Sequence, residues 1–167
     1  VQDEFSEAKG LNFVDPKQGH FTLKFLGETN PERCDKIHAA LKRAVDEADV
    51  EPFNCTIGGL GVFPSLEYIT VVWLGVREGK GAAELTWLHN ALEAELTKLG
   101  FDAENHEFTP HITLARMDDG RGKPFVQQVV QETDPTVGTF RVDCVRLTES
   151  TLTEAGPEYE TVAEVDL

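Results

Sequence analysis

Alternating and helical patterns of apolar residues divide the chain into strands and helices. Runs rich in β-branched and aromatic residues predict strands at 11–15, 20–26, 53–62, 68–74, 108–116, 139–148 and 159–165. Apolar residues at helical spacing predict helices from Asn30 to near Val50, from Leu85 to Leu99 and from Pro124 to Gln131. Strands and helices alternate without the glycine pattern of a dinucleotide-binding fold or a phosphate-binding loop. The pattern therefore predicts an α+β fold.

Boundary residues support two of these helices. Asn30 is a suitable N-cap, and Pro31 at the first helical position needs no hydrogen-bond acceptor for its nitrogen. Gly100 follows the apolar repeat of the second helix and predicts its end, because glycine readily adopts the left-handed conformation of a helix terminus.

Two segments of the chain repeat the same order of residues. His20-Phe21-Thr22-Leu23 and His111-Ile112-Thr113-Leu114 each lie in a predicted strand, and a turn and a helix follow each. Alternate residues of a strand point to one side, so each His shares a face with its Thr. We expect two lobes, related by an approximate two-fold axis, that bring these strands side by side.

Two imidazoles and two hydroxyls on one surface suit chemistry at a phosphodiester. Hydrolysis of a cyclic phosphate needs a base on one side of phosphorus and an acid on the other, and histidine performs either role near neutral pH. Threonine hydroxyls can donate to the non-bridging oxygens, whose charge grows in the transition state. Lys24, on the face of His20, either attracts phosphate or is a solvated residue at the strand end.

These motifs resemble the two-histidine phosphoesterase superfamily, and within it the RNA 2',3'-cyclic phosphodiesterase family, also called 2'-5' RNA ligase-like. The resemblance covers essentially the whole chain and extends to Gly59-Leu60-Gly61-Val62-Phe63-Pro64 and Val72-Trp73-Leu74-Gly75-Val76. It implies one domain, residues 1–167, of two interleaved lobes. These lobes would contain two antiparallel sheets flanked by helices, with the active cleft between them. It also implies hydrolysis of 2',3'-cyclic phosphate ends to 2'-phosphates without a metal or cofactor. Some members of the family additionally join tRNA halves through a 2'-5' linkage.

The resemblance also assigns roles to five residues. His20 and His111 match the catalytic pair, Thr22 and Thr113 match the phosphate ligands, and Arg116 matches an arginine that contacts the phosphate. Strict alternation would turn Arg116 away from Thr113, so its role requires the strand to end or bulge. The alternative is that Arg116 is exposed and paired with a nearby Asp. For hydrolysis we favour His111 as the base on water and His20 as the acid on the leaving O3'.

One feature departs from the family pattern. Family members open with a short apolar strand before the first helix, whereas this chain begins at Val1 with what resembles that helix. The chain also has no initiator Met. We therefore expect that the natural N-terminal strand precedes residue 1.

The charge and the cysteines limit the partners and the environment of the protein. Thirty Asp and Glu against 15 Lys and Arg give a net charge of −15, spread along all 167 residues. A dispersed acidic surface is screened in concentrated salt, which suggests a salt-loving source, and it disfavours a long nucleic-acid groove. We therefore expect a local site for RNA ends or nucleoside 2',3'-cyclic phosphates. Three separated cysteines and no membrane-length apolar run favour a cytoplasmic monomer that does not bind membranes.

Two other functions remain open at this stage. The four side chains could hold a phosphate without reacting with it, in a nucleotide-binding or RNA-end-binding module. A different two-histidine activity, on another cyclic phosphate or on a 2'-5' oligonucleotide linkage, would use the same groups.

Overall fold

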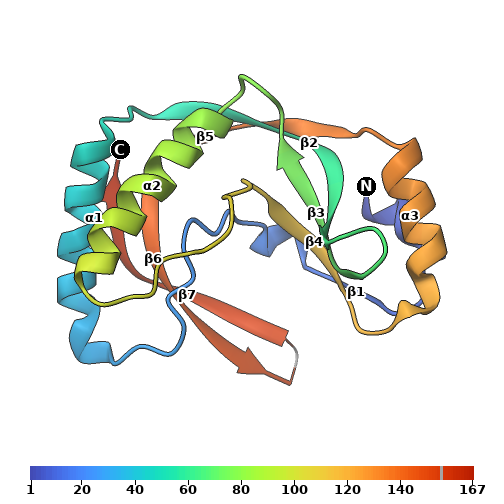
Figure 1. Ribbon diagram of the computed structural model, residues 1–167, viewed down its shortest axis with the longest axis horizontal. Coiled ribbons are helices and arrows are strands. Elements are labelled where there is room, and N and C mark those ends of the chain that lie inside the picture. Colours follow the sequence, from blue (N-terminus) through green and yellow to red (C-terminus); the bar gives the residue numbers. More distant parts are fainter. Residues whose placement is uncertain (155) are drawn as a thin grey trace. The chain divides into compact units, whose positions relative to one another are not determined.

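The computed structural model describes residues 1–154 and 156–167, and it divides the chain into two compact units (Figure 1). Unit 1 contains Val1–Thr22, Cys55–Ala82 and Thr109–Phe140, and unit 2 contains Leu23–Asn54, Ala83–Phe108 and Arg141–Leu167. Each unit is thus assembled from three separate stretches of the chain. All five residues with predicted site roles belong to unit 1.

The main element of unit 1 is a five-stranded sheet with the strand order β1-β4-β3-β2-β5. Its strands are β1 (Leu11–Phe13), β2 (Phe53–Pro64), β3 (Ile69–Val76), β4 (Ile112–Met117) and β5 (Thr136–Val142). The pairs β1–β4, β3–β4 and β2–β3 are antiparallel. β4 lies between β1 and β3, and pairing on both sides fixes the face to which its side chains point.

One face of this sheet is buried. Val72 on β3 lies opposite Ala115 on β4, and both side chains are completely buried. Phe5 in the 3-10 helix Gln2–Phe5 and Val126 in α3 (Lys123–Glu132) are also fully buried, and these two helices contact each other. Side chains that alternate with Val72 and Ala115 therefore point to the opposite face of the sheet.

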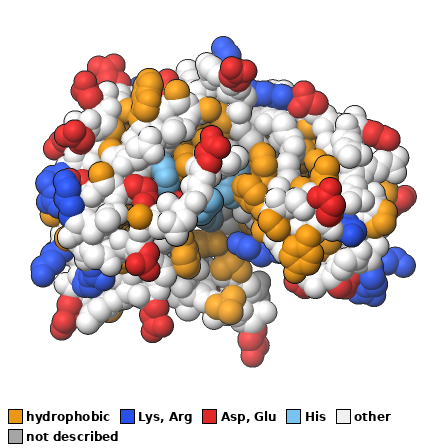
Figure 2. Space-filling model, in the orientation of Figure 1, with side chains coloured by type: hydrophobic (Ala, Val, Ile, Leu, Met, Phe, Trp, Pro, Cys, Tyr) orange, Lys and Arg blue, Asp and Glu red, His pale blue; other side chains and the backbone are white. Residues whose placement is uncertain are grey.

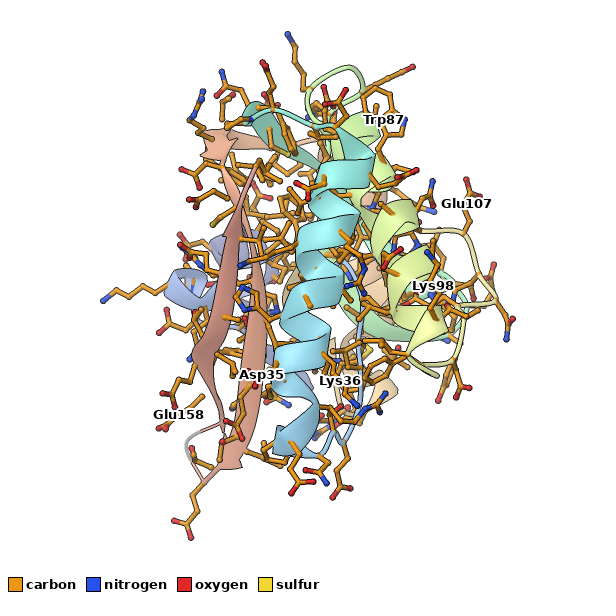
Figure 3. All side chains as sticks on the ribbon, turned by 90° about the vertical axis from the view of Figure 1, so that its left-hand side faces the viewer. Asp35, Lys36, Trp87, Lys98, Glu107 and Glu158 are labelled. Carbon is orange, nitrogen blue, oxygen red and sulfur yellow. The ribbon has the colours of Figure 1, made fainter. Side chains whose placement is uncertain are left out.

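Unit 2 consists of two helices and a hairpin. α1 (Cys34–Ala48) packs on the two-stranded sheet of β6 (Cys144–Thr153) and β7 (Gly156–Asp166), and α2 (Ala82–Lys98) lies beside α1 (Figure 3). Apolar side chains from these elements form one buried cluster: Ile37, Ala40, Leu41, Ala44, Val45, Val50, Leu88, Leu92, Leu96, Val145 and Val165.

Both helix boundary signals are confirmed. The Asn30 side chain accepts a hydrogen bond from the amide of Glu32, and the 3-10 turn Pro31–Arg33 leads into α1. Gly100 has φ of 87° directly after α2, in the left-handed region that glycine tolerates best. The α+β class is likewise confirmed.

Two predicted strands are wrong. Residues 20–26 form a single bridge, between Phe21 and Ile112, because Leu23 and Leu26 leave the sheet and pack against the core of unit 2. The segment 139–148 is not one strand, because the chain changes from the five-stranded sheet to the hairpin between β5 and β6. The predicted strand 108–116 begins later, at Ile112.

The described part of the chain contains no helix long and apolar enough to cross a membrane. Acidic side chains are scattered over the face of the molecule seen in Figure 2 and do not gather over one element. This distribution agrees with the even spread of acidic residues along the sequence.

Candidate active site

The two His-x-Thr motifs lie side by side in unit 1. An antiparallel bridge joins Phe21 to Ile112, the central residue of each motif. One residue on either side of that bridge, His20 faces Thr113 and Thr22 faces His111. The two histidines are therefore diagonal neighbours, and the β-carbons of such pairs lie somewhat less than about 7–8 Å apart. A local two-fold axis through the bridge relates the motifs.

The side chains of both motifs share one face of the sheet. A Cβ on Gly19 would lie 3.5 Å from Cγ2 of Ile112, so residues 19 and 21 point toward the side of Ile112. His20 alternates with them and points to the other side, where His111 and Thr113 also lie. The bridge thus brings together the two backbone segments that carry the four predicted side chains.

A backbone carbonyl orients each imidazole in the same way. Nδ1 of His20 lies 2.8 Å from the carbonyl oxygen of Gln18, and Nδ1 of His111 lies 2.7 Å from that of Thr109. A carbonyl oxygen can only accept, so Nδ1 must donate in both rings. In the neutral imidazole this arrangement leaves the lone pair on Nε2. The backbone contact is thus made by the same nitrogen, Nδ1, in both rings.

Aromatic side chains pack around His111. Its ring meets Phe63 edge-on, with centroids 4.9 Å apart, and its centroid is 6.0 Å from that of Trp73. Trp73 lies opposite Thr113 on one side and Gly61 on the other, so these residues form a row across the sheet. The His111 ring is thus held by the Thr109 carbonyl and by the side chains of Phe63 and Trp73.

The sequence did not identify Trp73 and Phe63 as neighbours of His111. A Cβ on Gly61 would lie 2.1 Å from Cζ2 of Trp73, so the indole occupies the space that any other residue at position 61 would fill. A glycine inside a strand is a known sign of such a close approach. Gly61 could therefore have indicated from the sequence that a side chain packs closely against this strand, although it does not show that the side chain is Trp73.

A bulge in β4 determines the direction of Arg116. Thr113 pairs with Trp73 and Ala115 pairs with Val72, so Leu114 is the extra residue on β4. Leu114 and Ala115 are both buried, and Arg116, opposite Val71, is exposed on the face that carries Thr113. This is the irregularity that the predicted role of Arg116 requires.

The alternative environment predicted for Arg116 is not observed. Within residues 1–154 and 156–167 Arg116 forms no ion pair, whereas Asp119 pairs with Arg121 and the Asp118 carboxylate accepts a hydrogen bond from Asn12. The Arg121 hydrogen bonds lower the pKa of Asp119 to about 2.

Both interpretations of Lys24 are wrong. Its side chain is only 3% exposed, and its ammonium forms an ion pair with Glu93 and donates to the carbonyl of Asp102 at 2.8 Å. It is therefore neither solvated nor available to a phosphate. Of the two cations considered for the site, only Arg116 shares a face with the His-x-Thr motifs.

Comparisons of the whole sequence agree on one family. A family model described as the 2'-5' RNA ligase superfamily matches residues 3–153. An RNA 2',3'-cyclic phosphodiesterase of Aeropyrum pernix is 37% identical over 93% of this chain and 85% of its own length. Its counterpart from Methanothermobacter thermautotrophicus is 35% identical over 95% of this chain and 84% of its own length.

Solved structures agree with the sequence comparison. The TT0787 protein of Thermus thermophilus aligns with a TM-score of 0.76 and 26% identity, over 99% of this chain and 87% of its own. Escherichia coli LigT, solved in complex with 3'-AMP, aligns with a TM-score of 0.74 and 25% identity, over 99% of this chain and 86% of its own. The fold of this chain is therefore similar to the folds of both solved proteins over nearly its whole length.

Proposed function

The chain belongs to the 2'-5' RNA ligase superfamily, and from this premise we propose that it hydrolyses RNA 2',3'-cyclic phosphate ends to 2'-phosphates. One observation carries the proposal: the antiparallel bridge between Phe21 and Ile112 makes His20 and His111 diagonal neighbours on one face. Displacement at phosphorus places the attacking and leaving oxygens in line, on opposite sides. Two imidazoles placed diagonally on one face suit that geometry.

In the proposed reaction the two imidazoles have complementary roles. His111 accepts a proton from the attacking water through Nε2, and His20 donates a proton from Nε2 to the leaving O3'. Hydrogen bonds from both Nδ1 atoms to backbone carbonyls support these roles, because they direct the reactive nitrogen of each ring away from its own backbone.

The proposed reaction assigns the remaining polar side chains to the phosphate. The hydroxyls of Thr22 and Thr113 donate to the non-bridging oxygens, and Arg116 compensates their charge. Each imidazole lies opposite the threonine of the other motif, so one phosphate can contact all four side chains. None of these steps uses a metal ion.

Substitution of each histidine tests the mechanism. We expect His20→Ala and His111→Ala each to lower kcat for a nucleoside 2',3'-cyclic phosphate by ~10²–10⁴-fold in the presence of EDTA, since this is the usual contribution of a positioned acid or base. His106→Ala is the matched control, because the His106 side chain is 77% exposed and is not in a His-x-Thr motif. Wild-type turnover should show a bell-shaped dependence on pH.

Several outcomes would contradict the proposal. Near-wild-type turnover in both variants would exclude the paired-histidine mechanism. Tight binding of the cyclic phosphate in a calorimeter, with the compound recovered unchanged, would instead indicate a non-catalytic binding module. A 3'-phosphate product would show that the opposite P–O bond breaks. Cleavage of a 2'-5' dinucleotide in preference to the cyclic phosphate would indicate the other two-histidine activity.

The superfamily that matches the chain also suggests a ligation reaction. Ligation would place a 5'-hydroxyl where water attacks in hydrolysis, so His111 would accept the proton of that hydroxyl and His20 would again protonate the leaving O3'. We propose that an RNA with a cyclic-phosphate end and a second RNA with a 5'-hydroxyl form a 2'-5' linkage. A labelled joined product, absent in His20→Ala and His111→Ala, would support this activity.

A further inference from the structure

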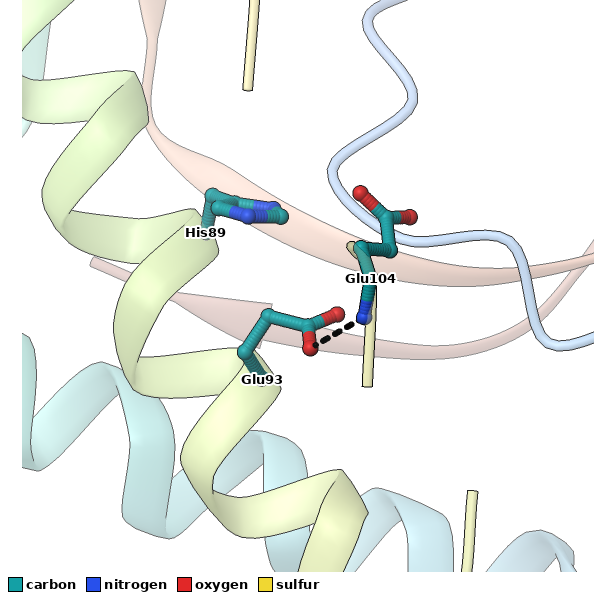
Figure 4. A group of neighbouring side chains, drawn as sticks. All are labelled: His89, Glu93 and Glu104. Atoms are coloured by element: carbon teal, nitrogen blue, oxygen red, sulfur yellow. Dashed lines mark hydrogen bonds between the residues drawn. The ribbon is translucent and has the colours of Figure 1, made fainter. Parts of the chain in front are cut away.

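A second cluster of charged and titratable side chains lies in unit 2, and the predicted reaction does not use it. Its members are Lys24, His89, Glu93 and Glu104, which we call the Lys24 cluster. His89 and Glu93 are one helical turn apart on α2 and point to the same side (Figure 4). The His89 residue is 5% exposed, and the side chains of Lys24 and Glu93 are 3% and 17% exposed.

The Lys24 cluster binds the chain directly after the first motif. Nδ1 of His89 lies 2.7 Å from the carbonyl oxygen of Leu23, the residue after Thr22. The next side chain, Lys24, pairs with Glu93 and donates to the Asp102 carbonyl. Two consecutive residues behind Thr22 are thus held to α2 and to the loop that follows it.

The same cluster contacts the chain directly before the second motif. The His89 ring stacks on Phe108, with centroids 4.2 Å apart and planes within 5°. Phe108 precedes Thr109, whose carbonyl orients the His111 ring. The other oxygen of Glu93 accepts a hydrogen bond from the amide of Glu104, at 3.2 Å, in the loop that leads to Phe108. α2 therefore restrains both chain segments next to the catalytic motifs.

An ion pair explains this cluster better than a metal site does. One ligand atom from each of His89, Glu93 and Glu104 lies within 4.8 Å of the others, which a cation could bridge. The ammonium of Lys24 already supplies the positive charge to Glu93. Burial raises the pKa of Glu93, but hydrogen bonds from Lys24 and the Glu104 amide outweigh it and the pKa is lowered. Glu93 is therefore a carboxylate matched to an internal cation.

We propose that Lys24, Glu93 and His89 are positioning residues, which hold the backbone next to both His-x-Thr motifs in the geometry that catalysis needs. The inference rests on the proposed phosphodiesterase function. None of the three is expected to contact the phosphate, so their loss should change kcat much more than KM. Small displacements of catalytic groups can lower rates by up to ~10²-fold.

The test compares two ion pairs on the same helix. We expect Lys24→Met and Glu93→Gln to lower kcat for a nucleoside 2',3'-cyclic phosphate by ~10-fold or more while KM stays within ~2-fold. Lys98→Met is the matched control, because Lys98 pairs with Glu95 on α2 but is 68% exposed. All variants are assayed well below their own thermal midpoints.

A double variant separates positioning from stability. In Lys24→Met/Glu93→Leu, apolar side chains replace both charges, and such exchanges often restore stability. We expect the thermal midpoint to recover while kcat stays low, because the bonds to the Asp102 carbonyl and the Glu104 amide remain absent. Recovery of kcat together with stability would overturn the proposal, and so would unchanged kcat in both single variants.

Two further measurements distinguish the possible failures. Zinc chloride is titrated into the wild type and into His89→Ala, and we expect no difference in zinc binding between them. A stoichiometric zinc site that is present in the wild type and lost in His89→Ala would overturn the proposal, because zinc would then replace Lys24 as the partner of Glu93. An inactive wild type would refute the proposed function and this inference with it. An active wild type with fully active Lys24→Met and Glu93→Gln would refute this inference alone.

Discussion

Gly61→Ala should damage the candidate active site although position 61 is in a different strand from either histidine. The added Cβ would lie 2.1, 2.3 and 2.5 Å from three atoms of the Trp73 indole, and ordinary contact begins at 3.4 Å. The indole must therefore move by about 1.3 Å.

The displaced Trp73 indole would move against the side chains of Phe63 and His111. The centroid of Trp73 is 5.1 Å from that of Phe63 and 6.0 Å from that of His111. Overpacking of this kind costs about 1–3 kcal/mol of stability. In a domain of this size, a loss of ~2 kcal/mol lowers the thermal midpoint by about 6 °C. A shift of His111 by a fraction of this movement should also lower kcat, by ~10-fold or more.

Thermal unfolding and turnover of a nucleoside 2',3'-cyclic phosphate measure the two effects. Gly138→Ala is the control, since Gly138 lies in β5 and has no atom within 4 Å of an added Cβ. In a Trp73→Leu background Gly61→Ala should cost less, with a coupling energy of about 1–2 kcal/mol. Equal midpoints and equal kcat for Gly61→Ala and Gly138→Ala would refute the reasoning.

Two further predictions concern arginines near the end of β4. Arg116→Met should lower kcat/KM for the cyclic phosphate by roughly 10- to 100-fold, because it removes one charge-assisted hydrogen bond. Arg121→Met is the control and should leave kcat/KM unchanged, because Arg121 is paired with Asp119. Equal losses in the two variants would exclude the role of Arg116. The pKa of Asp119, lowered to about 2 mainly by the Arg121 side chain, predicts a pH effect on stability. A carboxylate with a depressed folded-state pKa stabilises the protein above its unfolded value, ~3.9, and loses that effect as pH falls through its folded value. The advantage in thermal midpoint of wild type over Asp119→Asn should therefore disappear between about pH 4 and pH 2, and an advantage that is unchanged across this range would contradict the interpretation.

The sequence predicted correctly the features that depend only on residues close together along the chain. The cap at Asn30 and the stop at Gly100 act over a few residues, so both could be identified without knowledge of the fold. The His-x-Thr repeats were identified for the same reason, because alternation alone places His and Thr on one side. Their juxtaposition was predicted from the repeat and is observed in the Phe21–Ile112 bridge. The catalytic roles themselves remain predictions.

Features that depend on distant partners could not be predicted. Lys24 was considered a phosphate ligand or a solvated residue because its true partner, Glu93, is 69 positions away. The residues from Leu23 onward look like a continuing strand, but they belong to unit 2, where Leu23 and Leu26 pack against the buried cluster instead of pairing with a neighbouring strand. The direction of Arg116 depends on the extra residue Leu114, and a bulge is visible only when the partner strand is known. A local pattern predicts which residues share a face, but it does not identify what covers that face.

The charges of the protein indicate how it would recognise RNA. With a net charge of −15, its long-range field repels a polyanion. Lys24, the other cation considered for the site, is neutralised by Glu93. In the proposed reaction, affinity would therefore come from short contacts with one terminal phosphate, through the imidazoles and hydroxyls of the two motifs and the Arg116 guanidinium, which the bulge at Leu114 directs to the face of Thr113. We expect such a site to select the end of a strand over its interior, because a cyclic phosphate presents all its contact atoms to one small surface.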